Sequence, residues 1–332
     1  MPEKMRFSAV ICELNPLHLG HLSLLSAARS SSAGVVCILS GNFVQRGEPA
    51  ILDKWARARL ALQAGADLVV GLPLPWACAG AERFAQGGVA LAGALPQVGT
   101  LVFGSETPDS RRLLAAAEAL LSPGFADALR RLPEDGAPFA RRRQQALASL
   151  LGPGAAAILE APNATLGVEY CKAILAQGLP IAPVALPRTG AGHAQPAAPG
   201  EGLSASQLRA MLAAGEGITG LVPGFTQRVI EEEKAAGRCP ALLAPVERAV
   251  LARLRSMPPA AFACLPDISE GLENRLYRAA RPATPLEGLY ALAKAKRYTH
   301  ARLRRLVLSA FLGLARGGPP MPPYLHVLGM TD

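Results

Sequence analysis

The stretch from Phe7 to His21 constrains the fold of this chain more than any other. Residues 7–12 form an apolar run of strand length, Asn15-Pro16 is a turn signal, and apolar residues recur at helical spacing from Leu19 onward. This pattern predicts a strand, a tight loop and a helix. Similar apolar runs alternate with helical segments further along the chain, at 34–39, 66–72, 100–106 and 181–186. The alternation predicts an α/β fold with a doubly wound parallel sheet.

His18 and His21 lie three residues apart across the predicted helix start, so their side chains share one face of the helix. Gly20 between them lets a ligand approach the backbone. An anion here would meet unpaired backbone N–H groups, the positive end of the helix dipole and two imidazoles. Such a site suits a triphosphate at its reacting phosphorus. The alternative is a pair of packed, hydrogen-bonded histidines that contact no ligand.

Doubly wound sheets bind ligands at the carboxyl ends of their strands, near a switch in strand order. This rule brings the loop 14–20 and Gly104-Ser105 to one crevice. A second phosphate-binding arrangement is predicted at a later helix start, which carries Ser204, Ser206 and Arg209. Two such arrangements in one α/β domain favour a nucleotide as ligand.

Several helix boundaries can be predicted from capping residues. Asp53 is a candidate N-cap for a helix over 54–64, and a helix over 79–95 is expected to be interrupted at Gly87-Gly88. Asn163 is either the N-cap of another helix or a nucleotide contact.

The net charge of +9 and the pI of about 9.6 favour a polyanionic partner. A biased composition is the alternative, because only six of the 34 basic residues are lysine. The run Arg141-Arg142-Arg143 lies close to Arg130-Arg131 and fits either a nucleic-acid backbone or an exposed helix face. A second basic stripe includes Arg297 and Arg302, and it surrounds Tyr298, which could stack on a base.

The length of 332 residues predicts a large α/β domain and a smaller domain. Strand-like runs disappear beyond Pro223, so we expect a nucleotide-binding domain over 1–224 and a mostly helical region over 225–332. No apolar run has membrane-spanning length, and the first residues lack a signal peptide, which predicts a cytoplasmic protein without membrane contact. The six cysteines are scattered, and no Asp/Glu cluster argues for a dedicated metal site.

The motif N-P-x-H-x-G-H after a first strand resembles the H-x-G-H signature of the nucleotidyltransferase superfamily. Further segments narrow the resemblance to bacterial tRNA(Met) cytidine acetate ligases, nearly end to end. They are Glu13–His21, Ser40–Pro49, Lys54–Arg57, Phe103–Glu106, Pro162-Asn163, Leu166-Gly167, Arg188, Gly190–Gly192, Ser204–Arg209, Glu270–Asn274 and Lys296–Thr299.

The resemblance implies a Rossmann-like nucleotidyltransferase fold and a two-step reaction. ATP and acetate would form acetyl-adenylate and pyrophosphate, and the acetyl group would pass to the wobble cytidine of elongator tRNA(Met). It also implies ATP contacts from Ile11, Cys12, Glu13, Leu14, Asn15, Pro16, Leu17, His18, Leu19, Gly20, His21, Leu22, Ser23 and Leu24, with Gly104, Asn163 and Arg188.

In that reaction His18 and His21 would stabilise the α-phosphate and the departing pyrophosphate. Ser204, Ser206 and Arg209 would hold the triphosphate tail, with Mg²⁺ accompanying ATP. Two other functions stay open. One is a small-molecule adenylyltransferase, although the basic helical tail would then have no purpose. The other is an RNA-binding protein without catalysis, against which the intact histidines and Arg209 weigh. The oligomeric state is not indicated.

Overall fold

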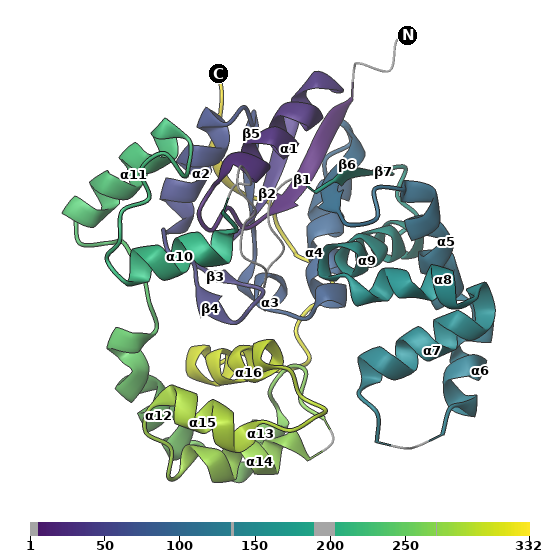
Figure 1. The fold of residues 1–332 in the computed structure, drawn as a ribbon, viewed down its shortest axis with the longest axis vertical. Helices are drawn as coiled ribbons and strands as arrows, with labels where there is room; N and C mark the ends of the chain where they lie inside the picture. The colour runs from purple at the N-terminus through teal and green to yellow at the C-terminus, as the bar shows by residue number, and fades with distance from the viewer. Residues whose placement is uncertain (1–5, 134–135, 189–202, 270) are drawn as a thin grey trace.

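The centre of the structure is a six-stranded sheet with the strand order β7-β6-β1-β2-β5-β8 (Figure 1). The computed structural model describes residues 6–133, 136–188, 203–269 and 271–332. The strands span β1 Phe7–Cys12, β2 Val35–Ser40, β5 Leu68–Leu72, β6 Val98–Ser105, β7 Ala182–Pro187 and β8 His326–Met330. All run parallel except β8, which is antiparallel to β5. The predicted doubly wound parallel sheet is confirmed.

Helices cover both faces of this sheet because successive side chains of a strand point to opposite faces. In β1, Ala9 and Ile11 enter one hydrophobic core, while Val10 and Cys12 enter the other. The first core is covered mainly by α4 Ala81–Gly93, α5 Ser110–Leu121 and α9 Pro162–Ala176. The second is covered by α1 Leu19–Ser30, α2 Lys54–Gln63, α10 Ala205–Ala213 and α11 Gly224–Ala235.

The strand order reverses between β1 and β6. From β1 the chain proceeds to β2 and β5 on one side, and then crosses to β6 and β7 on the other. The loops that follow β1 and β6 therefore diverge and open a crevice at the carboxyl edge of the sheet, as the sequence predicted.

Gly87 and Gly88 do not interrupt α4, contrary to the prediction, and both lie inside the helix. A Cβ atom on Gly87 would come within 2.4 Å of the Trp76 side chain, and one on Gly88 within 2.6 Å of Ile11. These glycines therefore allow α4 to pack closely against β1 and the short helix α3 Leu74–Ala77. Tertiary packing outweighs their low helix propensity.

The helical region forms a body with its own core, which includes Phe262, Leu289 and Leu303. Its helices are α12 Glu247–Ser256, α13 Pro259–Ala263, α14 Leu272–Ala280, α15 Leu286–Ala293 and α16 His300–Leu312. A separate arm of α6 Pro123–Arg131, α7 Phe139–Leu151 and α8 Pro153–Ala156 extends from α5 and α9 (Figure 1). No helix in the described parts of the chain is both long enough and apolar enough to span a bilayer.

Two segments beyond the predicted boundary at residues 224/225 pack with the α/β domain. Val229 and Ile230 of α11 belong to the second core of the α/β domain, so this helix lies on the nucleotide-binding side. Beyond the helical body, β8 returns to the sheet and pairs with β5. A single short strand at the end of the chain gives no alternating pattern of strands and helices, and the expectation that strands cease after Pro223 therefore missed it.

The helical body touches the α/β domain through α16 and the hairpin of β3 Phe43–Val44 and β4 Glu48–Pro49. Arg305 Nη1 donates to the carbonyl oxygen of Gln45 at 3.4 Å. Gly47 has a φ of +76°, and a Cβ atom there would lie 2.4 Å from the backbone nitrogen of Arg305. Only glycine fits this close approach without displacing α16.

Candidate active site

The loop after β1 presents His18 and His21 in a capping box. His18 is the N-cap of α1, and its Nδ1 accepts a hydrogen bond from the backbone nitrogen of Gly20 at 3.0 Å. Nδ1 of His21 accepts from the backbone nitrogen of His18 at 3.3 Å, and the two ring centroids are 3.9 Å apart. Because both Nδ1 atoms are acceptors, each neutral ring carries its proton on Nε2. The cap thus fixes both tautomers.

This geometry corrects one part of the predicted anion site. The backbone N–H of Gly20 is bonded to the His18 ring, so it is not one of the unpaired groups expected to meet an anion. The pKa of His21 lies well below its ordinary value, first because the ring is removed from water and then because His18 and Arg188 are close. At neutral pH, His21 is therefore a neutral donor through Nε2.

A cavity of about 600 Å³ opens in front of these rings, at the switch between β1 and β6. It brings together most of the predicted ATP contacts: Ile11, Cys12, Glu13, Asn15, His18, Gly20, His21, Ser23, Leu24, Gly104, Asn163, Arg188, Ser206 and Arg209. Gly104 has no heavy atom within 4 Å of an added Cβ, which leaves its backbone open to a ligand.

Six predicted contacts do not line this cavity. Leu14 and Leu17 are buried in the second core, Pro16 is buried, Leu22 packs against the same core, and Leu19 is largely exposed. Ser204 is only 3% exposed and caps α10: its Oγ accepts from the backbone nitrogen of Gln207, whose side chain bonds back to Ser204. This capping box removes Ser204 from the predicted phosphate site.

Arg209 joins α10 to the histidine loop. Its Nη1 donates to the carbonyl oxygen of Asn15 at 2.9 Å, and Nη2 lies 3.1 Å from both Ser206 Oγ and Glu48 Oε1. These contacts hold the guanidinium at the cavity wall. Two segments almost 200 residues apart thus meet at the cavity wall.

Asn163 does not cap α9, because Ala161 occupies the N-cap position. Its Nδ2 instead donates to Oε1 of Glu106 at 2.6 Å, while the backbone nitrogen of Ala164 donates to Oε2 at 2.8 Å. Arg188 Nη1 lies 3.8 Å from the same carboxylate. Glu106, Arg188 and Asn163 thus form one cluster at the cavity. They follow β6, follow β7 and begin α9, respectively.

Arg57, in the segment Lys54–Arg57 named above for the resemblance, is buried and stabilises the cavity floor. Arg57 is fully buried and donates to the carbonyl oxygens of Glu13 at 2.7 Å, Ser40 at 3.0 Å and Leu52 at 3.0 Å, and to that of Gly41. Burial lowers the pKa of Arg57 to about 10, so it stays charged at neutral pH. It ties together the loops that follow β1 and β2.

Residues outside the predicted ATP contacts also line the cavity. Gln45 and Arg46 come from the polar loop after β2, and the apolar wall includes Phe84, Phe103 and Tyr170. The position of the loop after a buried strand was a usable signal. The aromatic residues give no such signal in the sequence, because core packing would require the same residue types.

The predicted tRNA contacts on α7 are only partly available. Arg143 Nη2 lies 2.6 Å from Oε1 of Glu169, a carboxylate that is 2% exposed, and Arg142 donates to the carbonyl oxygen of Leu129. Arg143 therefore compensates a buried charge, and of the three only Arg141 is exposed. Fewer arginines of this run can contact an external polyanion than the sequence predicts.

Tyr298, predicted to stack on a base, is only 6% exposed and packs in the core of the helical body. Arg302 donates to the carbonyl oxygen of Asp267 and to Ser269 Oγ, both at 2.7 Å. Arg297 is exposed, as expected of a contact to an external polyanion.

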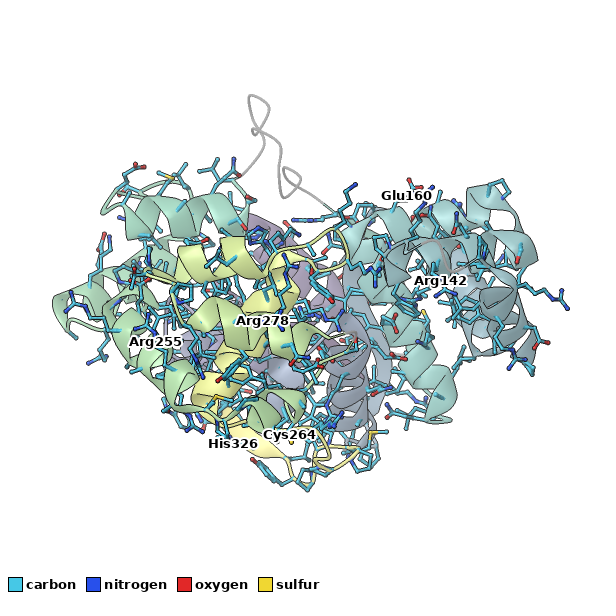
Figure 2. All side chains as sticks on the ribbon, turned by 90° about the horizontal axis from the view of Figure 1, so that it is seen from below. Arg142, Glu160, Arg255, Cys264, Arg278 and His326 are labelled. Atoms are coloured by element: carbon cyan, nitrogen blue, oxygen red, sulfur yellow. The ribbon has the colours of Figure 1, made fainter. Side chains whose placement is uncertain are left out.

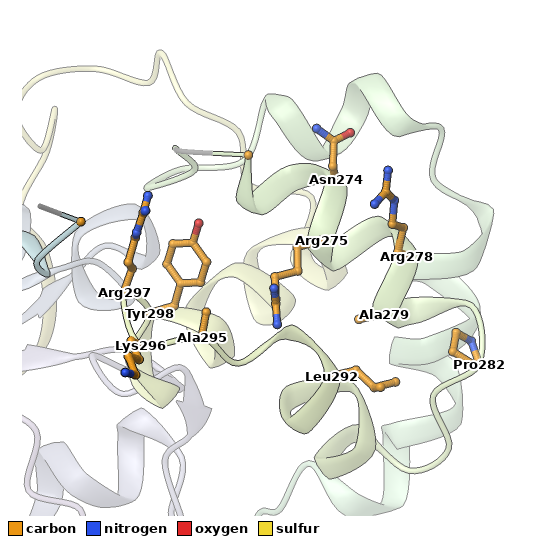
Figure 3. Close-up of a pocket in the computed structure, with 12 residues that line it drawn as sticks. Asn274, Arg275, Arg278, Ala279, Pro282, Leu292, Ala295, Lys296, Arg297 and Tyr298 are labelled. Carbon is orange, nitrogen blue, oxygen red and sulfur yellow. The ribbon is translucent and has the colours of Figure 1, made fainter. Parts of the chain in front are cut away.

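A second cavity, of about 830 Å³, lies on the helical body and is also lined by Gly136, between α6 and α7 of the arm (Figure 3). Its polar lining includes Asn274, Arg278, Lys296 and Arg297, and none of the described residues that line it is acidic. Arg275 Nε and Nη2 donate to the carbonyl oxygens of Ala293 and Lys294, which fixes the loop that carries Lys296. Figure 2 shows Arg278 on the helical body and Arg142 on the separate arm.

Among the described residues, no group of three or more His, Cys, Asp or Glu side chains could hold a metal ion. The fold and the first cavity together define an α/β nucleotide-binding protein of the nucleotidyltransferase class, with its H-x-G-H motif at the switch point.

Comparison with known proteins identifies the family. The family described as HIGH Nucleotidyl Transferase matches residues 5–332. A tRNA(Met) cytidine acetate ligase of Caldanaerobacter subterraneus subsp. tengcongensis is 36% identical over 99% of this chain and 84% of its own length. That of Syntrophotalea carbinolica is 37% identical, covering 98% and 80%. The chain belongs to the HIGH nucleotidyl transferase family and, within it, to the family of the tRNA(Met) cytidine acetate ligases.

Solved structures agree. The chain resembles Thermotoga maritima TmcAL in its apo form with a TM-score of 0.93 and 32% identity, over 99% of this chain and 81% of that one. The same protein bound with alpha-thio ATP gives a TM-score of 0.90 and 31% identity, with the same coverage.

Proposed function

We propose that this protein is a tRNA-modifying ligase, which activates acetate with ATP and transfers the acetyl group to the wobble cytidine of elongator tRNA(Met). One observation carries the proposal: the cavity at the switch point holds Arg209 and the two histidines that cap α1. The relatives of the chain are named for this activity. The similar structure with bound alpha-thio ATP supports ATP as the nucleotide.

In the first step an acetate oxygen attacks the α-phosphorus of ATP, and the bond to the bridging oxygen of pyrophosphate breaks. Nε2–H of His18 and His21 would stabilise the charge on the α-phosphate and the leaving oxygen. Arg209 and Ser206 would hold the outer phosphates, and Mg²⁺ accompanying ATP would neutralise part of their charge. Two anions react here, so neutralisation of charge and alignment of the reactants are the main tasks of the site.

In the second step the exocyclic amine of cytidine attacks the acetyl carbonyl carbon, the amine loses a proton, and AMP leaves with the electron pair of the broken bond. The product is N4-acetylcytidine. The base must be unstacked to reach the cavity, and single-stranded anticodon loops allow this.

We place the tRNA backbone on the second cavity rather than on α7. Arg278, Lys296 and Arg297 offer cations there without an acidic residue among the described lining. Arg141 and Arg302 are proposed as flanking contacts. Arg142 and Arg143 are not, because Arg142 bonds to Leu129 within the arm and Arg143 pairs with the buried Glu169 of α9. The helical body, residues 243–312, is thus the proposed tRNA-binding unit. The α/β domain with α11 and β8 is the proposed catalytic unit. We also propose a cytoplasmic location, because ATP and tRNA are both found there.

The proposal is tested by acetate-dependent exchange of labelled pyrophosphate into ATP without tRNA. We expect exchange only when acetate is present, because acetyl-adenylate forms reversibly before tRNA is needed. Incorporation of AMP into a stable small-molecule product without acetate would instead identify an adenylyltransferase. Absence of any ATP chemistry with tRNA and acetate would favour an RNA-binding protein.

A further inference from the structure

Glu106 lies just beyond β6 and uses both carboxylate oxygens at the start of α9. Oε1 accepts from Nδ2 of Asn163 at 2.6 Å, and Oε2 accepts from the backbone nitrogen of Ala164 at 2.8 Å. Burial opposes the ionised form, but the hydrogen bonds from Asn163 and Ala164 and the charge of Arg188 hold the pKa of Glu106 below its usual value. Glu106 is therefore an anion at neutral pH.

An ionised carboxylate can only accept hydrogen bonds, so Asn163 must present its NH₂ group to Glu106. The carbonyl oxygen Oδ1 lies on the other branch of the amide, and Asn163 lines the first cavity. Within the described residues, no hydrogen bond is donated to this Oδ1 atom. Glu106, which does not itself line the cavity, therefore decides which end of the Asn163 amide is left for a ligand.

We propose that Glu106 is a positioning residue that holds the carbonyl oxygen of Asn163 toward the bound nucleotide, so that the cavity selects a hydrogen-bond donor of ATP. The inference rests on the proposed function of this cavity as the ATP site. The group selected is the amino group of adenine, which only donates, whereas the two ribose hydroxyls both donate and accept and would fit either orientation of the amide. A 6-oxo purine presents an acceptor where adenine presents its amino group, and an acceptor facing Oδ1 is repelled.

The variant Glu106→Gln inverts this preference. Its single carbonyl oxygen can keep the hydrogen bond from Ala164, and its NH₂ group then faces Asn163. The Asn163 amide must turn by half a rotation to avoid two opposed donors, which places Nδ2 toward the cavity.

The experiment measures acetate-dependent pyrophosphate exchange with ATP, inosine triphosphate, 2′-deoxy-ATP and 3′-deoxy-ATP. For the wild type we expect inosine triphosphate, which lacks the amino donor read by Asn163, to have a KM about tenfold above that of ATP. In Asn163→Ala this ratio should fall to about one, and in Glu106→Gln it should fall to one or below, with kcat changed less. Glu82→Gln is the matched control, since it removes a carboxylate that pairs with Lys172 of α9 without contact to Asn163.

Each outcome decides the question. If Glu106→Gln lowers the melting temperature but leaves the nucleotide preference unchanged, Glu106 only stabilises the start of α9 and the proposal is wrong. The same holds if the wild type uses all four nucleotides equally. If the wild type shows no exchange with any nucleotide, the proposed function itself fails, and this inference fails with it.

Discussion

His21 has two separable tasks, because its two ring nitrogens face different partners. Nδ1 completes the cap of α1, and Nε2–H is available to a phosphate. Asparagine can place an acceptor where Nδ1 lies but has no group at the position of Nε2. We expect His21→Asn to reduce acetate-dependent pyrophosphate exchange by about 10²–10³-fold, with unfolding little changed. His300→Asn, at the exposed start of α16, is the control. Exchange at the wild-type rate in His21→Asn would show that the ring has no role in the chemistry.

The low pKa of His21 also predicts how stability depends on pH. The unfolded chain binds a proton at the ordinary value of 6.5, whereas the folded ring does so only at lower pH. The unfolded state therefore gains protons first as the pH falls below 6.5, and the fold loses stability there. Above 6.5 both states are neutral at this residue. Thermal unfolding between pH 7.5 and 5.5 should show a steeper loss for the wild type than for His21→Asn; parallel curves would contradict the assigned shift.

Single residues also show where prediction from sequence stops. His18, His21, Ser206 and Arg209 could be found because their motifs are local, and the structure brings them to one cavity. Arg143 could not be recognised as an internal ion-pair partner, because Glu169 is 26 positions away and only the fold brings the two together. The contacts of Arg57 to Glu13 and Ser40 could not be predicted either, because these partners are also distant in the sequence.

At the scale of elements, the start of α10 separates a capping serine from a ligand-facing one. Ser204→Ala removes the N-cap and should lower stability by about 1 kcal/mol, with little effect on the KM for ATP. Ser206→Ala should do the reverse, because Ser206 lines the cavity and supports Arg209. Denaturant unfolding and pyrophosphate exchange measure the two effects. An equal rise in the KM for ATP in both variants would show that Ser204 also contacts the phosphates.

Elements built from continuous apolar runs were predictable, and the five parallel strands were found within a few residues of their observed ends. The exceptions depend on distant partners. β8 is a strand because β5 offers it a free edge, and α4 passes through Gly87-Gly88 because Trp76 and Ile11 need the space. Neither partner can be inferred from a local window.

At the scale of the whole molecule, the ATP cavity and the helical body are joined through the β3–β4 hairpin. Glu48 lies 3.1 Å from Arg209 in the cavity and 3.7 Å from Arg304 on α16. The helical body is thus held at a fixed place beside the cavity, as an enzyme that must present a tRNA base to a bound adenylate requires.

The second cavity predicts the salt dependence of tRNA binding. Replacing Arg278 and Arg297 together by glutamine should weaken tRNA binding and reduce the slope of log affinity against log salt by about 1 for each lost phosphate contact. Pyrophosphate exchange should not change. Arg253→Gln, exposed on α12 and outside the cavity, is the control. An unchanged slope in the double variant would place the tRNA elsewhere.

The measurement that tests the central claim most directly is mass spectrometry of nucleosides from elongator tRNA(Met) incubated with the protein, ATP and isotopically labelled acetate. The proposed reaction predicts N4-acetylcytidine that carries the label, at the wobble position, only when protein, ATP and acetate are all present. Unmodified tRNA, with AMP incorporated into a small-molecule product instead, would contradict it.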